Sequence, residues 1–266
     1  MITEEDEREA LEVLRPSYKE NKELIPYREE NNLIKRAIDI ERRRGFVNTT
    51  MFFLEYLYQN GINFFGNIYL KRGHNYNVYR SFKSTLTPWR GERECELPLA
   101  KIFLDSATPD KIMEVGNVLN HYYNVNHLVV DKFEQGNNVI NEDIVGFRIP
   151  RKFNLIISIS TIEHIGKDED SKNPLKFLKA IEVCKNLLED NGQFIFTFSW
   201  NYNAHLEERV RLNKLAGFTY SYFKKQGVNW FELSEEQFSN LIKVKQQPNT
   251  LLVLCKYIKA QAGGMR

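Results

Sequence analysis

The sequence from Lys111 to Asp131, KIMEVGNVLNHYYNVNHLVVD, decides the fold because it contains two short apolar runs, each ending at a carboxylate. We interpret the runs as two buried parallel strands joined by a short crossover, with Glu114 at the end of the first and Asp131 after the second. Gly116 follows the first strand, and a glycine there lets the backbone approach a ligand closely. An acid at the tip of the second strand can accept hydrogen bonds from a ribose diol, so the stretch predicts a nucleoside-containing cofactor.

From this stretch onwards, strands and helices alternate. Near-continuous apolar runs such as residues 155–159 are typical of a sheet that is covered on both faces. The predicted strands are Lys111–Val115, His127–Val130, Val139–Asn141, Phe153–Ser158, Gln193–Ser199, Phe218–Phe223 and Thr250–Ile258. A helix is predicted over Pro174–Leu188, stopped by Asp190-Asn191-Gly192, and another around Ser234–Val244, which begins with a Ser-Glu-Glu-Gln capping signature. The pattern predicts an α/β fold with a doubly wound, mostly parallel sheet and helices on both faces.

The first 88 residues differ in character from the rest. Residues 1–50 are rich in both acidic and basic side chains, and their apolar residues recur at helical spacing. A more buried helix is predicted from about residue 49 to residue 60, an irregular stretch over Tyr69–Thr87, and a helix over Trp89–Asp105. We therefore divide the chain into a mainly helical extension, 1–88, and an α/β domain, 89–266. The extension could serve as a lid, a homodimer surface or a docking arm.

Composition narrows the class of protein. The chain has 266 residues, 42% of them hydrophobic and 27% charged, and its formal charge of +2 is close to neutral. It therefore gives no electrostatic reason to expect nucleic acid or an anionic membrane as a partner. Cys95, Cys184 and Cys255 are far apart, which favours free thiols in a reducing compartment. The apolar runs are too short to span a bilayer, so we expect a soluble, cytoplasmic protein.

Taken in order, five segments resemble the motifs of class I S-adenosylmethionine-dependent methyltransferases of the small-molecule, Rossmann-like type, over roughly residues 89–259. The segments are Ile112-Met-Glu-Val-Gly-Asn-Val, Leu128-Val-Val-Asp-Lys, Val139-Ile-Asn-Glu-Asp-Ile, Phe153-Asn-Leu-Ile-Ile-Ser-Ile-Ser-Thr-Ile-Glu-His-Ile, and Leu178–Phe198. The resemblance implies a seven-stranded sheet with an antiparallel last strand, and S-adenosylmethionine bound across the carboxyl ends of the strands where the strand order reverses. The chain departs from the family in its glycine motif, because Gly116 is followed by Asn117-Val118-Leu119-Asn120.

The resemblance also implies roles for the residues around the cofactor. Glu114 is expected near its amino group or holding the glycine turn in shape, and Asp131 at its ribose. Glu142, Asp143 and Ile144 are expected at the adenine. The full predicted set is Glu114, Gly116, Asn117, Asp131, Lys132, Glu142, Asp143, Ile144, Ser158 and Ser160, with the two serines at the methionine part and Asn117 suited to a left-handed backbone. Glu114 could instead cap a nearby amide, Asp131 could be a solvated turn acid, and the serines need no function.

His164 is the candidate for acid–base catalysis, because an imidazole can take a proton from a hydroxyl or amine near neutral pH. A structural hydrogen bond is the competing interpretation. The residues Trp200, Asn201, Tyr202, Trp89, Arg93 and Glu96 are candidates to line the acceptor pocket. The remaining histidines have no spacing that suggests a metal site.

Three functions remain open from the sequence. The first is methyl transfer to a small-molecule, glycan or lipid-linked acceptor. The second is a binding or scaffold protein that keeps the fold without catalysis, which the reduced glycine motif favours. The third is a nicotinamide-dependent oxidoreductase, for which the third glycine of the pyrophosphate motif is missing.

Overall fold

The computed structural model describes residues 92–122, 125–136, 138–169, 173–226, 229–243 and 250–261. The predictions for residues 1–91, including the helical extension, the irregular stretch and a dimer surface, lie outside the described residues. No helix in the part of the chain that the structure describes is long and apolar enough to cross a bilayer.

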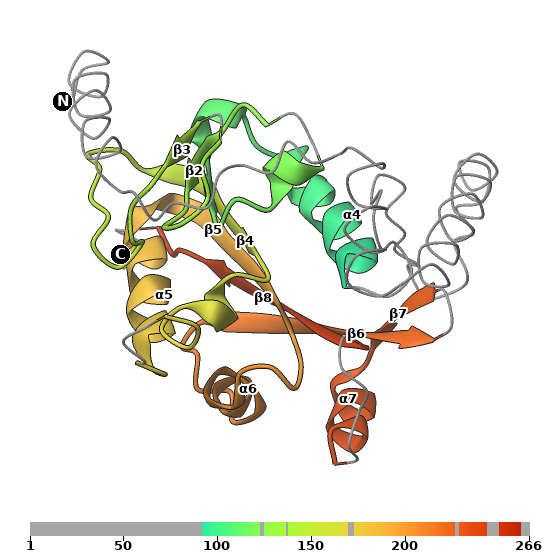
Figure 1. The fold of residues 1–266 in the computed structure, drawn as a ribbon. Helices are drawn as coiled ribbons and strands as arrows, with labels where there is room; N and C mark the ends of the chain where they lie inside the picture. Colours follow the sequence, from blue (N-terminus) through green and yellow to red (C-terminus); the bar gives the residue numbers. More distant parts are fainter. Residues whose placement is uncertain are drawn as a thin grey trace, which may run out of the picture.

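One eight-stranded sheet organises the described chain, with the strand order β3-β2-β1-β4-β5-β8-β6-β7 (Figure 1). The strands are β1 (Ile112–Val115), β2 (Leu128–Val130), β3 (Val139–Ile140), β4 (Phe153–Ile159), β5 (Leu188–Ser199), β6 (Phe218–Gln226), β7 (Asn229–Leu233) and β8 (Leu251–Ile258). β3, β2, β1, β4 and β5 pair in parallel, whereas β8 is antiparallel to both β5 and β6, and β7 is antiparallel to β6. The mostly parallel sheet is confirmed. The expected seven strands are wrong, because β7 adds an eighth at the edge.

The helices cover both faces of the sheet. They are α4 (Arg93–Leu104), α5 (Lys176–Leu187), α6 (Ala204–Arg211) and α7 (Glu235–Leu241), with short 3-10 turns η2 (Pro109–Lys111), η3 (Leu119–His121) and η4 (Ile162–His164). Along β5, Phe194 and Phe196 pack in one core with α5, while Ile195 between them packs in the other core with α4. Successive strand residues face opposite sides, so the sheet is buried on both faces. In Figure 1, α4 lies on the opposite side of the sheet from α5.

The crossover between β1 and β2 is short, and its described residues carry the 3-10 turn η3 and no α-helix. Parallel strands need a connection of about a dozen residues, which is usually an α-helix. The pairing of Glu114 with Val129 confirms that the two strands are parallel neighbours. In the described chain, the first α-helix after β1 is α5, which follows β4.

The sequence misplaced the boundary between α5 and β5. The helix ends at Leu187 and the strand begins at once, so Asp190-Asn191-Gly192 lies inside β5 rather than in a stop signal. Asn191 has a φ of +62°, and the register against β4 shifts between Phe153 and Leu155. The turn residues thus form an irregularity within the strand. The helix α6 and the strand β7 were not predicted, whereas the capping box of Ser234 and Gln237 at α7 is confirmed.

Candidate functional site

A cavity of about 410 Å³ opens at the carboxyl ends of β1, β2, β3 and β4. The strand order reverses between β1 and β4, and ligands of open α/β sheets bind at such a point. The lining residues are Val115, Gly116, Val130, Asp131, Lys132, Phe133, Glu142, Asp143, Ile144, Thr161, His164, Ile165, Asp168 and Glu169. Seven of the residues expected from sequence are among them.

A second cavity of about 360 Å³ adjoins the first. The two share Asp131, Phe133, Thr161 and His164, and the second extends to Arg93 at the start of α4. Among the residues expected from sequence, Asn117, Ser160 and Arg93 line this second cavity and not the first. A ligand spanning the shared residues would therefore meet the predicted residues of both cavities.

Gly116 makes the tight turn that follows β1. Its φ is +89°, and a Cβ at this position would lie 2.7 Å from Cγ2 of Thr161 in the loop after β4. The glycine is thus required by its backbone conformation and by the close approach of two loops of the protein. The left-handed residue is Gly116 itself, and Asn117, which the sequence suggested could tolerate this conformation, is not among the described residues with positive φ.

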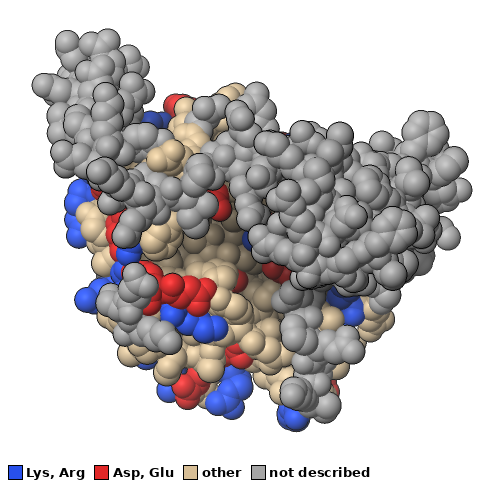
Figure 2. Space-filling view, viewed as in Figure 1, with Lys and Arg blue, Asp and Glu red and all other residues tan. Residues whose placement is uncertain are grey.

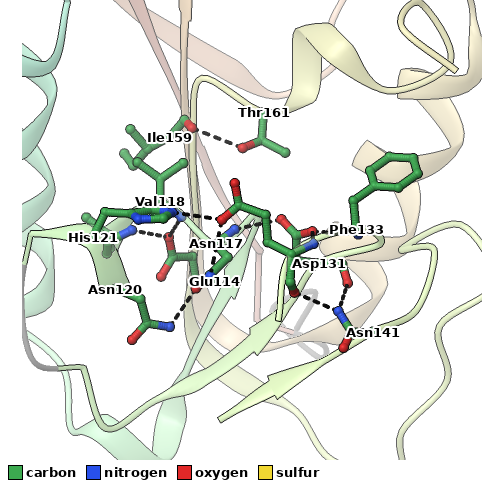
Figure 3. A network of polar contacts seen from close by, with 12 residues as sticks. Glu114, Asn117, Val118, Asn120, His121, Asp131, Phe133, Asn141, Ile159 and Thr161 are labelled. Atoms are coloured by element: carbon green, nitrogen blue, oxygen red, sulfur yellow. Dashed lines mark hydrogen bonds and ion pairs between the residues drawn. The ribbon is translucent and has the colours of Figure 1, made fainter. Parts of the chain in front are cut away.

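Glu114 holds this turn from below. Its side chain is fully buried, and Oε1 accepts hydrogen bonds from the backbone N–H of Val118 at 3.0 Å and of Leu119 at 2.8 Å (Figure 3). Oε2 lies 3.0 Å from Nε2 of His127. Glu114 lines neither cavity, so of the two roles expected from sequence the structure supports shaping the turn. Ser158 is also buried and lines neither cavity. Its hydroxyl donates a hydrogen bond to the carbonyl of Val115 at 2.8 Å.

Asp131 lines both cavities and also shapes the backbone around it. Oδ2 accepts the N–H of Asn117 at 2.8 Å, and Oδ1 accepts those of Phe133 at 2.7 Å and Glu134 at 2.6 Å (Figure 3). A carboxylate has about four lone-pair sites, so three amides leave one site, at Oδ2. The carboxylate thus holds the backbone of two loops, and it leaves room for one further donor.

The structure distinguishes the two acids after β3. Asp143 is already bound, because its carboxylate accepts from Lys176 at 2.5 Å and from the N–H of Val145 at 3.1 Å. Burial raises the pKa of Asp143, but the hydrogen bonds from Lys176 and Val145 outweigh it, so the pKa lies below the ordinary value. For Glu142, burial alone acts and raises the pKa of the carboxyl. Within the described residues, nothing hydrogen-bonds to the Glu142 carboxyl, so of this pair it is the acid that can bind a ligand.

Two lysines and two acids form a closed ion network beside the first cavity. The Nζ of Lys176 lies 2.5 Å from Asp143 Oδ2 and 2.6 Å from Glu169 Oε2. The Nζ of Lys132 lies 2.8 Å from the same Glu169 oxygen and 3.3 Å from the same Asp143 oxygen. The network joins the loops after β2, β3 and η4 to the start of α5. Lys132 and Asp143, both expected from sequence to contact the cofactor, thus form ion pairs that connect the loops lining the first cavity.

His164 lies where the two cavities meet and belongs to a polar cluster. Its Nδ1 is 2.5 Å from Oδ2 of Asp168 and 2.9 Å from the hydroxyl of Tyr202. Tyr202 also donates to Asp168, and Lys167 binds the carbonyl of Tyr202. The structural hydrogen bonds of His164 are thus present at Nδ1, and the imidazole also lines both cavities. Its acid–base role stays a prediction.

A buried polar group lies behind the second cavity. Glu96, fully buried on α4, accepts hydrogen bonds at Oε1 from the hydroxyls of Ser160 and Thr197, both at 2.6 Å, and forms an ion pair with Arg93. Glu163 is buried close by, and within the described residues its Oε2 has no hydrogen-bond partner. Burial raises the pKa of the Glu163 carboxyl to about 8.

Some residues expected from sequence lie elsewhere. Trp200 is buried, packs edge-on against Phe238 with ring centroids 4.9 Å apart, and lines a separate cavity between α6 and α7 together with Asn201. Neither lines the two joined cavities, so their expected acceptor role is not supported, and Trp89 lies outside the described residues. The sequence interpretation missed Phe133, Thr161, Asp168 and Glu169 as lining residues. Their positions in the sequence could have indicated them. Phe133 and Thr161 directly follow Lys132 and Ser160, and Asp168 and Glu169 follow the Glu-His-Ile segment.

Charges of both signs occur on the visible surface. In Figure 2, Lys and Arg side chains and Asp and Glu side chains both lie on the part that is not grey, separated by larger areas of uncharged residues. In the described residues, no group of three His, Cys, Asp or Glu side chains is placed to hold a metal ion.

Comparison with known proteins gives distant structural likenesses only. No protein-family model and no curated protein matches the sequence. The N-methyltransferase NodS from Bradyrhizobium japonicum WM9, in complex with S-adenosyl-L-homocysteine, is similar at 15% identity over 65% of this chain and 92% of that chain, with a TM-score of 0.44. An rRNA methylase from Streptococcus thermophilus is 13% identical over 62% of this chain and 97% of that chain, with a TM-score of 0.38. The phosphoethanolamine N-methyltransferase 2 of Haemonchus contortus is 12% identical over 63% of this chain and 53% of that chain, with a TM-score of 0.39.

Proposed function

We propose that this protein is an S-adenosylmethionine-dependent methyltransferase that binds its cofactor in the first cavity. One observation carries the proposal. Gly116, Asp131 and Glu142, which follow three successive strands, converge on a single cavity at the point where the strand order reverses. This is the arrangement that the motif order of the sequence implies.

Each part of the cofactor has a residue of suitable chemistry. Asp131 has one acceptor site left for a ribose hydroxyl, and hydrogen bonds to a carboxylate are stronger than those to a neutral group. Glu142 is available for the amino group of the adenine, with the buried Ile144 beside it for the ring. Asn117 and Ser160 lie in the adjoining cavity, where the methionine part would extend. Glu114 and Ser158 support the turn and the strand from behind.

The charge of the cavity suits a cation. Five carboxylates line it, from Asp131, Glu142, Asp143, Asp168 and Glu169. Lys132 and Lys176 pair with two of them, Asp143 and Glu169, so Asp131, Glu142 and Asp168 make a negative surplus. Coulomb attraction is strengthened where water is partly excluded, so this surplus favours a positively charged sulfonium over a pyrophosphate. A dinucleotide also needs a helix N-terminus for its phosphates. In the described part of the crossover after Gly116, the 3-10 turn η3 takes the place of such a helix.

Our candidate site for the acceptor is the part of the second cavity that the methionine moiety would leave free. S-adenosylmethionine supplies a methyl group that its positive sulfur has already activated, so the protein mainly has to align the reactants and exclude water. His164 lies at the junction of the cavities, where it could take a proton from a hydroxyl or amine. We propose a small-molecule, glycan or lipid-linked acceptor.

Titration calorimetry on the full chain tests this function against its two alternatives. S-adenosylhomocysteine should bind with a Kd of about 1–100 μM, which corresponds to about 5–8 kcal/mol, and NADH should give no heat. Absence of heat with millimolar S-adenosylhomocysteine would favour a scaffold protein without cofactor. Binding of NADH in its place would favour the oxidoreductase.

A further inference from the structure

The cluster of His164, Asp168 and Tyr202 connects two parts of the chain that are distant in sequence. His164 ends η4, Asp168 lies four residues later, and Tyr202 follows β5. The rings of His164 and Tyr202 have centroids 4.5 Å apart. The Nζ of Lys167 lies 3.5 Å from the centroid of the Tyr202 ring and also binds the Tyr202 carbonyl, so one lysine contacts both the ring and the backbone of the tyrosine.

The proton positions in this cluster follow from its donors and acceptors. An ionised Asp168 can only accept hydrogen bonds, and the Tyr202 hydroxyl donates to it. Although partial burial raises the pKa of Asp168, the hydrogen bonds from Tyr202 and His164 outweigh it and keep the pKa below its ordinary value. Because Asp168 Oδ2 is 2.5 Å from Nδ1 of His164, that nitrogen must carry a proton.

We infer that Asp168 is a positioning residue that holds neutral His164 in the Nδ1–H tautomer, which leaves Nε2 as a proton acceptor where the two cavities meet. Among the described residues, none hydrogen-bonds to Nε2 of His164. The use of Nε2 in catalysis rests on the proposed function, whereas the tautomer follows from the cluster alone.

The inferred step is a proton transfer that needs no further reactant. A proton leaves the oxygen or nitrogen of the acceptor and joins Nε2, so His164 changes from neutral to cationic. Asp168 keeps its charge and its hydrogen bond to Nδ1, and it then faces an imidazolium instead of a neutral ring. An orienting carboxylate of this kind selects the reactive tautomer and stabilises the cation that forms.

An ordinary surface ion pair would not explain the same contacts. The side chains of His164 and Asp168 are each 44% exposed, and an isolated exposed pair at this spacing contributes little to stability. Here a third side chain from another element bonds to both members, and a lysine fixes that third residue. The arrangement restricts the imidazole in a way that two exposed side chains could not.

The test is ¹⁵N NMR of the histidine rings in the full-length protein, at a pH high enough for the rings to be neutral. The His164 signals are assigned by their loss in His164→Asn. In the wild type we expect Nε2 to give the shift of an unprotonated nitrogen. Asp168→Asn, which can donate to Nδ1 through its amide, should move the proton to Nε2.

Two results would overturn the inference: a wild-type His164 protonated at Nε2, or a tautomer unchanged by Asp168→Asn. The matched control is Asp105→Asn, which breaks the exposed pair with Lys101 on α4 and should leave the His164 signals unchanged. Calorimetry with S-adenosylhomocysteine on the same samples separates the two claims. If the wild type shows the expected tautomer but does not bind S-adenosylhomocysteine, the proposed function is contradicted and the inferred tautomer stands. If it binds S-adenosylhomocysteine but shows the other tautomer, the inference about Asp168 is contradicted and the proposed function stands.

Discussion

The backbone N–H of Asn117 donates a 2.8 Å hydrogen bond to Oδ2 of Asp131, so the turn after β1 and the acid after β2 form one unit. The same carboxylate accepts two amides of its own loop. A ligand that uses Asp131 therefore meets an acid whose position is already fixed. This preorganisation lowers the entropic cost of binding.

Gly116→Ala should destabilise the protein by roughly 1–3 kcal/mol, because a left-handed φ strains any residue with a Cβ and the new methyl would press on Thr161. The matched control is Gly146→Ala, whose Cβ would meet only the carbonyl of Asp143 at 3.6 Å and should cost little. Urea unfolding of both variants measures the difference. Equal stabilities would contradict the role of Gly116.

Glu142→Gln should weaken the binding of S-adenosylhomocysteine by about 1–2 kcal/mol, roughly 5- to 30-fold, with little change in Tm, because the carboxyl is bound to no described residue. Asp143→Asn is the matched variant at the neighbouring position. It should lower Tm more than affinity, because it breaks the contact with Lys176. Calorimetry and thermal unfolding of the pair measure both effects. A reversed pattern would exchange the roles of the two acids.

Lys176→Met should cost about 1–2 kcal/mol at pH 7, since it removes the cation nearest to Asp143 and Glu169 in a partly buried network. The folded pKa of both acids is lowered, because contacts with the lysines outweigh burial. The stability they contribute is therefore present above their ordinary pKa and lost as the pH falls through the folded pKa. The difference in the free energy of unfolding between Lys176→Met and the wild type should therefore shrink towards pH 3.

The control for this variant is Lys101→Met. Lys101 pairs with Asp105 in an exposed position, so its loss should cost less than about 0.5 kcal/mol at any pH. A similar cost for both lysines in urea unfolding would show that the network does not stabilise the wall of the cavity.

Glu163→Gln should change how stability depends on pH. The pKa of Glu163 is raised from 4.5 to about 8, so between these values the folded state binds a proton that the unfolded state has lost. Wild-type stability should fall as the pH rises through this range, by roughly 2–4 kcal/mol relative to the variant, and stay constant relative to it outside the range. Urea unfolding at pH 5 and pH 8 checks this, with the exposed Glu182→Gln as control. Parallel curves for wild type and variant would mean that Glu163 is ionised in the folded state.

The parallel strands were predictable because their signals are local. The apolar runs ending at Glu114 and before Asp131 need burial on both faces, and a sheet supplies it. The start of β5 was not predictable in the same way. Asp190-Asn191-Gly192 has the chemistry of a turn, and only the pairing with β4 shows that it lies within a strand.

The residues of the site likewise fall into those that local sequence predicts and those that it does not. Gly116, Asp131 and Glu142 lie next to strand ends, so their convergence follows from the strand order. The other partners depend on distances in sequence that no local pattern reveals. Asp143 is bound by Lys176, 33 residues away, and His164 meets Tyr202, 38 residues away. Lys132 and Asp143 could therefore be placed near the cavity from sequence, but not assigned to an ion network.

A crystal structure of the full chain grown with S-adenosylhomocysteine tests the central claim most directly. We predict the adenosyl group in the first cavity, with the ribose at Asp131, the adenine amine at Glu142 and the homocysteine part extending past Gly116 towards Ser160. The account is contradicted if the ligand binds outside this cavity, or if the cavity stays empty at saturating ligand.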